Sequence, residues 1–243
     1  MLTTSLNILN EGGTIAPLNH TFIAVIPKIE KPKKVTEYRL ISFCNVIYKI
    51  GAKTIANRVE NVLHHIISPT QSALIPKRLI YDNIIIGYEC LHKIRLSTGK
   101  KNEFVALKLD ISKAYERVEW NFLNYTMQRL GLSTKWESLI MRCRSTSSFF
   151  VLINGEAKGL IHPQRELWQD CSLSPYSFII CTEVFLYLVV QVESRHLIHG
   201  LKFSRDLSIS HLLFADNNLI FTTATTKDCT NLKAIFYCYA ITS

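Results

Sequence analysis

Apolar and polar residues alternate with a period of two over residues 104–110, which read Phe-Val-Ala-Leu-Lys-Leu-Asp. That period predicts a β-strand, and the carboxylate of Asp110 closes it. Farther along, two apolar runs flank Ala-Asp-Asn-Asn at residues 215–218, which is turn chemistry. We therefore expect a β-hairpin with Asp216 near its tip. A strand-end carboxylate and a hairpin-tip carboxylate form the pair that a two-metal phosphoryl-transfer site requires.

Other strands are predicted in the first two thirds of the chain. Residues 21–26 form an apolar run that predicts a strand, followed by a lysine-rich loop from Pro27 to Thr36. Residues 149–153 and 156–161 flank Asn154-Gly155, the pair that favours a type I′ turn. We therefore expect a second hairpin there.

A helical period predicts the longer helices. Residues 45–67 form one, ended by Ser68-Pro69, and residues 134–137 form a capping box that opens another. The apolar stripe of the first comprises Ile47, Ile50, Ile55, Val59, Val62, Leu63 and Ile66. Asp82 is expected to cap a further helix whose inward side chains are Ile84, Ile85, Tyr88, Leu91 and Ile94. Polar residues interrupt the apolar window 176–192, which favours a buried helix over a membrane span.

Charge and cysteine content narrow the class of protein. The chain has 243 residues, and 48% of them are hydrophobic, which is enough to form a core in one or two domains. Its net charge is +9. Residues 1–100 hold 13 Lys and Arg against 6 Asp and Glu. This excess of positive charge is consistent with binding to a polyanion such as RNA or DNA, and equally with a generally basic soluble domain that binds none. The seven cysteines include no CxxC pair, which predicts reduced core residues of an intracellular protein of the nucleus or cytoplasm, without zinc. The N-terminus lacks the basic-then-apolar order of a signal peptide.

The two aspartate motifs, Leu107-Lys-Leu-Asp-Ile-Ser-Lys-Ala-Tyr115 and Phe214-Ala-Asp216, resemble the metal motifs of reverse transcriptases. Their order and spacing are similar to those of non-LTR (LINE-type) retrotransposon polymerases of plants, and the resemblance runs from about residue 18 to the C-terminus. It implies an α+β fold with polymerase fingers and palm, in which a small antiparallel sheet has helices packed on one face. Residues 1–17 would be a lead-in, 18–103 fingers-like and 104–243 palm-like, with no thumb.

The resemblance also implies a role for individual residues. Asp110 and Asp216 would be catalytic and would bind metal together with the Ile111 carbonyl and Asn217; the expected ion is Mg²⁺, with Mn²⁺ as the other option. Arg39, Tyr115 and Gln169 would bind the nucleotide, with Arg39 on the triphosphate and Tyr115 against the ribose. Contacts to nucleic acid would come from Lys28, Lys33, Lys34, Gln71 and Arg78. For Gln71 a structural hydrogen bond is an equal alternative.

Several motif positions depart from the family. Asn217 stands where a second aspartate is usual, and residues 166–172 match the family turn only at Gln169. Trp168 replaces a family arginine and Asp170 a glycine. Asn217→Asp alone is expected to recover little activity, and adding Asp170→Gly and Trp168→Arg is expected to recover more. These departures predict an RNA-directed DNA polymerase domain with weak or no activity. The alternative is a non-catalytic nucleic-acid-binding remnant of a decayed retroelement.

The partners implied are an RNA template, a DNA primer and deoxynucleotides. Neither a membrane nor a stable protein partner is indicated.

Overall fold

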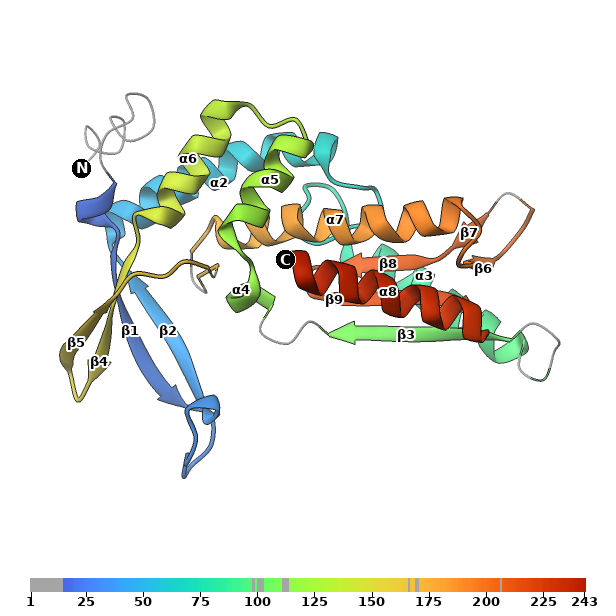
Figure 1. Cartoon of the computed structure of the whole chain (residues 1–243), viewed down its shortest axis with the longest axis horizontal. Helices are drawn as coiled ribbons and strands as arrows, with labels where there is room; N and C mark the ends of the chain where they lie inside the picture. Colours follow the sequence, from blue (N-terminus) through green and yellow to red (C-terminus); the bar gives the residue numbers. More distant parts are fainter. Residues whose placement is uncertain are drawn as a thin grey trace. The chain divides into compact units, whose positions relative to one another are not determined.

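The structure is a computed structural model that describes residues 15–97, 99, 103–110, 114–165, 167–168, 171–205 and 207–243 (Figure 1). The chain divides into two compact units, and each combines two separate stretches. The first unit is Met1–Val59 with Tyr115–Ser177, and the second is Glu60–Ala114 with Phe178–Ser243. Each unit takes residues from both sides of residue 103, and the division into a fingers-like and a palm-like region stays a prediction.

The first unit contains a four-stranded sheet of order β2-β1-β4-β5. Strands β1 (His20–Pro27) and β2 (Tyr38–Cys44) pair antiparallel around the lysine-rich loop, which includes η2 (Val35–Glu37). Strand β4 (Ser148–Ile153) runs parallel to β1 and turns back into β5 (Glu156–Ile161). Asn154 and Gly155 between them have φ of 53° and 83°, which confirms the predicted type I′ turn.

The helical part of the first unit comprises η1 (Ala16–Leu18), most of α2 (Val46–Ile66) and of α4 (Ala114–Arg117), α5 (Trp120–Arg129), α6 (Thr134–Ser145) and the first turn of α7 (Ser174–Ser194). The α2 helix is confirmed, but its buried face differs from the predicted stripe. Ile55 and Val59 are buried, whereas Ile50 is 45% exposed. The buried face instead includes the small residues Ala52 and Ala56, which an apolar-periodicity argument based on large side chains underweights.

The second unit contains a three-stranded antiparallel sheet of order β3-β9-β8, from β3 (Phe104–Asp110), β8 (His211–Phe214) and β9 (Asn217–Thr223). A separate small pair joins β6 (Leu201–Lys202) to β7 (Ser208–Ile209). The strand ending at Asp110 and the hairpin around Asp216 are thus both confirmed.

Helices cover both faces of this three-stranded sheet, so the prediction of helices on one face describes only part of it. On one face, Phe185 and Val189 of α7 and Leu232 of α8 (Thr226–Thr242) pack with Leu213 and Ile220. On the other face, α3 (Ile80–Ser97) packs through a cluster comprising Ile86, Cys90, Ile94, Leu212, Leu219 and Phe221.

The predicted inward face of α3 is wrong except at Ile94, which packs against the buried cluster. Ile84 and Tyr88 are 56% and 68% exposed, whereas Gly87 and Cys90 are buried. A Cβ atom added at Gly87 would lie 3.7 Å from side-chain carbons of both Leu212 and Leu219. The helix therefore approaches the sheet through its small residues, which leaves large apolar side chains outside.

The predicted helix starts are close but not correct in detail. Ser133 is the N-cap residue of α6, and Thr134 is its first residue rather than its cap. Asp82 lies in the first turn of α3 and does not precede it. Helix α7 is long and apolar enough to cross a membrane by length and composition, and 56% of that window is buried inside the protein. Its buried Phe185, Leu186 and Val189 belong to the core described above.

Candidate metal and nucleotide site

The sheet of the second unit brings the end of β3 next to the turn between β8 and β9. Asp110 is the register partner of Asn217 across β3 and β9, and Phe214 is the partner of Asn217 across β8 and β9. The turn that this second pair closes contains only Ala215 and Asp216. The backbone positions of the two predicted catalytic aspartates are thus adjacent. The Asp110 side chain and the whole of Ile111 lie outside the described residues, so two carboxylates facing each other stays a prediction.

The polar side chains at the tip of this turn contact one another. Asp216 is half-buried and Asn217 is exposed. The Asn217 Nδ2 donates to Asp216 Oδ1 at 3.1 Å, which leaves the other oxygen of Asp216 and the amide oxygen of Asn217 as acceptors. These are hard oxygen donors, which fit Mg²⁺ or Mn²⁺. In the part of the chain whose side chains are described, no group of three or more His, Cys, Asp or Glu could hold a metal ion.

The backbone of the turn is strained, and a buried glutamine holds it. Ala215 has φ of +51°, a left-handed conformation that costs a non-glycine residue about 1 kcal/mol. Its N–H donates to Gln71 Oε1 at 3.2 Å, and Ala73 N–H donates to the same oxygen at 3.1 Å. Gln71 is 1% exposed, so the structure corrects the predicted template contact in favour of the structural alternative.

Arg78, the other predicted template contact of this loop, is occupied by its own backbone. Its Nη1 donates to the carbonyl oxygens of Ser68 and Gln71 at 2.5 and 2.6 Å, and its Nη2 donates to that of Ile67 at 3.2 Å. Three carbonyl acceptors tie the guanidinium to the loop that carries Gln71. This arrangement favours a structural role for Arg78 over a phosphate contact.

A pocket of about 440 Å³ lies between α3 and the sheet, beside the same turn. Its polar lining comes from Asn83, Lys108, Asn217 and Asn218, and the rest is apolar. Asn83 Nδ2 donates to Leu213 O at 2.8 Å, which fastens α3 to β8. The exposed amide of Asn217 therefore borders both the turn and an apolar cavity.

The predicted nucleotide residues that the structure describes belong to the first unit. Arg39 lies in β2 as the register partner of Ile26 and is exposed. Leu40, at the position of the family proline, continues the strand as the partner of Val25. Because side chains alternate along a strand, Arg39 and Leu40 point to opposite faces of this sheet.

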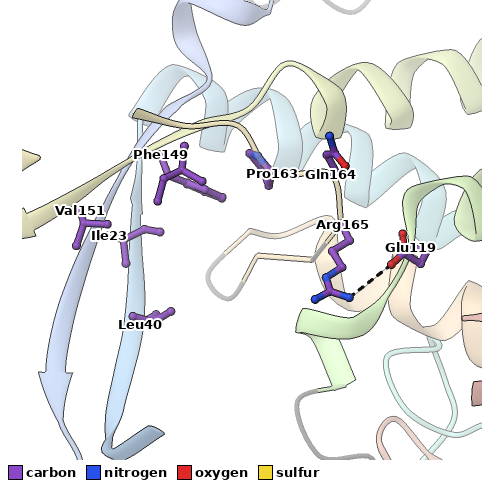
Figure 2. A pocket seen from close by; sticks show the side chains of 9 residues that line it. Ile23, Leu40, Glu119, Phe149, Val151, Pro163, Gln164 and Arg165 are labelled. Atoms are coloured by element: carbon purple, nitrogen blue, oxygen red, sulfur yellow. Dashed lines mark ion pairs between the residues drawn. The ribbon is translucent and has the colours of Figure 1, made fainter. Parts of the chain in front are cut away.

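The face that carries Leu40 forms a second pocket, of about 550 Å³ (Figure 2). Its walls are mainly aliphatic and aromatic, from Ile23, Leu40, Phe149, Val151, Ile161 and Pro163. At its rim the Arg165 guanidinium points toward Glu119, with Nη1 3.7 Å from Oε1 (Figure 2). Arg39 does not line this pocket.

Tyr115 lies in α4, half-buried, and its carbonyl oxygen accepts from Leu167 N–H at 2.7 Å. Tyr115 belongs to the first unit, whereas Asp216 belongs to the second. A cleft shared by the two residues therefore stays a prediction. Gln169 lies outside the described residues.

The lysine-rich loop makes backbone hydrogen bonds to the carboxylate of Glu37. The backbone N–H groups of Lys33 and Lys34 donate to Glu37 Oε2, and these two bonds lower the pKa of the Glu37 carboxyl. Lys28 Nζ donates to Thr36 O at 3.1 Å, which uses one of its three donors. The side chains of Lys33 and Lys34 are exposed on this loop.

Trp168, which sequence reasoning read as the loss of a family arginine, is a core residue. It is 1% exposed and packs between Tyr48 and Phe149, at ring-centroid distances of 5.7 and 5.0 Å. An arginine at this backbone position would sit inside an aromatic core. We therefore expect Trp168→Arg to disturb this core, and any recovery of activity by the combined variant stays a prediction.

Comparisons with known proteins show which family the chain resembles. Residues 29–239 match the model of the family described as reverse transcriptase (RNA-dependent DNA polymerase). The chain is 30% identical over 167 residues to an uncharacterized 149 kDa protein of transposon TX1 from Xenopus laevis; the match covers 69% of this chain and 12% of that protein. It is 43% identical over 67 residues to an uncharacterized mitochondrial protein of Arabidopsis thaliana, covering 27% of this chain and 55% of that protein.

Solved structures share the fold. Telomerase from Candida tropicalis, truncated from its C-terminal domain, superposes with a TM-score of 0.59 at 12% identity, over 92% of this chain and 48% of that one. Telomerase from Candida albicans, in complex with a fragment of telomeric RNA, gives a TM-score of 0.59 at 12% identity over 90% and 40% of the two chains. The chain thus spans about half or less of most of these proteins. With the family model matched over most of its length, this α+β chain belongs to the reverse transcriptase (RNA-dependent DNA polymerase) family.

Proposed function

We propose that this domain is the polymerase core of a non-LTR retroelement, which extends a DNA primer on an RNA template by two-metal nucleotidyl transfer, at a strongly reduced rate. The observation that carries the proposal is the register of β3 with β9, which sets the backbone of Asp110 beside the Asp216 turn. The telomerase bound to RNA and the transposon protein support RNA as the template.

The metal-holding groups would be the carboxylates of Asp110 and Asp216, the Ile111 carbonyl and the Asn217 amide oxygen. Bound divalent ions supply positive charge for the triphosphate and acidify the primer hydroxyl. Arg39 would contact the triphosphate, Tyr115 would exclude a ribose 2′-hydroxyl, and Gln169 would complete the nucleotide contacts. The ion would be Mg²⁺, with Mn²⁺ able to replace it.

Asn217 is one of two reasons for expecting a reduced rate, and the departures from the family turn at residues 166–172 are the other. Its amide offers a neutral oxygen, and in this structure its nitrogen faces Asp216. The proposed metal-holding groups therefore include the two carboxylates of Asp110 and Asp216 and no third negative charge. Losing about 3 kcal/mol of transition-state stabilisation would already slow the reaction roughly a hundredfold.

A metal titration tests the site without requiring activity. Electron paramagnetic resonance should show Mn²⁺ binding that weakens by about tenfold or more in Asp216→Asn, because a charged ligand is replaced by a neutral one. Asn217→Asp should bind Mn²⁺ more tightly than the natural chain. Asp82→Asn, an exposed carboxylate in α3, is the matched control and should bind as the natural chain does. Equal binding by the natural chain and Asp216→Asn would exclude this site.

Primer extension on an RNA template tests the reaction. The natural chain should give weak or no extension with Mg²⁺ or Mn²⁺, Asn217→Asp alone should recover little, and Asp110→Ala should remove whatever extension remains. Extension that persists in Asp110→Ala would assign the activity to other residues. Robust extension by the natural chain that Asp110→Ala removes would confirm the polymerase and overturn the reduced rate.

The exposed Lys33, Lys34 and Arg39 favour a second candidate, a nucleic-acid-binding remnant without catalysis. Replacing all three by alanine should weaken RNA binding and lower the salt slope by about one unit for each phosphate that is no longer neutralised. The matched control replaces the exposed Lys202, Lys227 and Lys233 of the second unit, which removes the same charge. An identical loss in both triple variants would indicate a general charge effect instead of a binding loop.

A further inference from the structure

Gln71 lies in a short extended segment that continues the sheet of the aspartate hairpin. Leu213 N–H donates to Thr70 O and Ser72 N–H donates to Leu213 O, both at 3.4 Å, which makes Gln71 the parallel bridge partner of Leu213 in β8. Thr70 Oγ1 also contacts His211 Nε2 at 3.1 Å. The segment around Gln71 is therefore fastened along the strand that leads into the turn.

The side chain of Gln71 then reaches past the end of β8 to the turn itself. Its Oε1 accepts from Ala215 N–H, the residue immediately before Asp216, and from Ala73 N–H in its own loop. Both partners are backbone donors, so the amide oxygen, and not the nitrogen, must face them. Among the described residues the Nε2 atom of Gln71 has no hydrogen-bond partner. The side chain is thus held through its acceptor alone.

The loop that carries Gln71 is fixed from its other side. Arg78 donates to three of its carbonyl oxygens, and Ser68 N–H donates to Glu183 Oε1 of α7 at 3.0 Å. A side chain that is 1% exposed on such a loop has little freedom to move. Gln71 therefore presents a rigid acceptor to the one residue of the turn with a positive φ, Ala215.

We propose, resting on the metal-binding role of Asp216 proposed above, that Gln71 is a positioning residue that fixes the strained Ala215 backbone and thereby the direction of the Asp216 carboxylate. It acts through the backbone and does not touch the metal or the substrate. Strained turns persist only where their surroundings hold them, and Gln71 Oε1 is the side-chain acceptor that holds Ala215 here.

Hydrogen exchange in the metal-free full chain tests the contact directly. Gln71→Met keeps the length and removes the acceptor, and exchange of the Ala215 amide should accelerate by about tenfold or more. Gln71→Glu keeps an acceptor oxygen and should restore slow exchange. Thr70→Val, which removes the hydroxyl beside His211 Nε2 in the same loop, is the control and should leave the Ala215 amide slow.

Mn²⁺ affinity then tests the positioning. Gln71→Met should weaken Mn²⁺ binding by about tenfold, because a disordered turn must be fixed before the ligand oxygen can bind. Gln71→Glu keeps the acceptor and should bind Mn²⁺ within about threefold of the natural chain. Exchange of the Ala215 amide that stays slow in Gln71→Met, or Mn²⁺ binding unchanged despite fast exchange, would overturn the role of Gln71.

The two hypotheses fail in different ways. If Asp216→Asn binds Mn²⁺ as well as the natural chain does, the proposed metal site is wrong and Gln71 positions no metal ligand. If Asp216→Asn binds weakly while Gln71→Met binds normally, the metal site stands and Gln71 alone is excluded. If Gln71→Met does not fold, Gln71→Ser replaces it, because the serine hydroxyl is too short to reach Ala215. Slow exchange of the Ala215 amide and normal Mn²⁺ binding in Gln71→Ser would exclude the positioning role of Gln71.

Discussion

The indole of Trp168 lies against the ring of Phe149, with ring centroids 5.0 Å apart and an interplanar angle of 59°. This tilted geometry is favourable for two aromatic rings, and Tyr48 covers Trp168 from another side. Trp168 lies in residues 166–172, the stretch that the resemblance to reverse transcriptases implies would face the nucleotide. The aromatic packing makes Trp168 a core residue of the first unit.

Replacing Trp168 by arginine should destabilise the protein instead of restoring function. The change removes a buried aromatic ring and buries a charge, and we expect a loss of about 3–5 kcal/mol in the free energy of unfolding. Urea unfolding measures this loss. Trp168→Phe should lose less, and Tyr237→Arg at a site 69% exposed should lose almost nothing. Equal stability of Trp168→Arg and the natural chain would show that Trp168 does not support the core.

Replacing Asn218 by valine should stabilise the second unit. Asn218 is 1% exposed between Leu109 and Leu213, and neither polar atom of its amide has a hydrogen-bond partner among the described residues. Removing an unsatisfied buried amide and adding a β-branched residue to a strand should raise the free energy of unfolding by roughly 1–2 kcal/mol. Thermal or urea unfolding measures the change. Asn218→Asp, which buries a charge instead, should lose stability, and a loss in Asn218→Val would point to a hidden partner of the amide.

Glu183→Gln should stabilise the protein at alkaline but not at acidic pH. Burial raises the pKa of Glu183 to about 7, against smaller opposite effects of the Ser68 N–H and of Arg78. A carboxyl whose pKa is raised on folding binds its proton more tightly in the folded state, so its contribution to stability is lost as pH rises from about 4.5 through 7. Glutamine keeps the acceptor for Ser68 and carries no charge.

We therefore expect Glu183→Gln to exceed the natural chain by roughly 1–3 kcal/mol at pH 8 and to equal it near pH 4.5. Urea unfolding at the two pH values measures the difference. The same difference at both pH values would mean that the carboxyl does not titrate in this range.

Asp228 should have the opposite pH dependence. Burial alone would raise its pKa, but hydrogen bonds from Thr223, Thr222 and His199 outweigh burial and lower it to about 2. A carboxyl whose pKa is lowered on folding stabilises the protein above its unfolded value of 3.8, and that stabilisation is lost as pH falls toward 2.

Asp228→Asn should cost roughly 1–2 kcal/mol at pH 7, and its deficit relative to the natural chain should shrink between pH 4 and pH 2. Unfolding monitored by circular dichroism at each pH measures this. Asp82→Asn, also in a first helical turn but exposed, should change stability by less than about 0.5 kcal/mol. A deficit that does not shrink with falling pH would assign the effect to packing instead of charge.

The sequence alone determined the features that depend on local patterns. The alternation over residues 104–110 predicts β3, and Asn154-Gly155 predicts the type I′ turn with two positive φ values. Two apolar runs flank Asp216 and predict a hairpin. In the structure, Ala215 and Asp216 form its two-residue turn. Periodicity and turn chemistry act over a few residues, so each of these features is encoded where it occurs.

The tertiary structure alone decided which side chains are buried and which acceptors are used. Periodicity placed Ile84 and Tyr88 of α3 inward, but the helix packs through Gly87 and Cys90 because small residues allow closer approach to Leu212 and Leu219. Gln71 and Ala215 are 144 residues apart. The sequence leaves a template contact and a structural hydrogen bond of Gln71 as equal alternatives, and the pairing of its loop with β8 brings the side chain to Ala215. Burial and long-range hydrogen bonds depend on which surfaces meet, and a local sequence pattern does not contain that information.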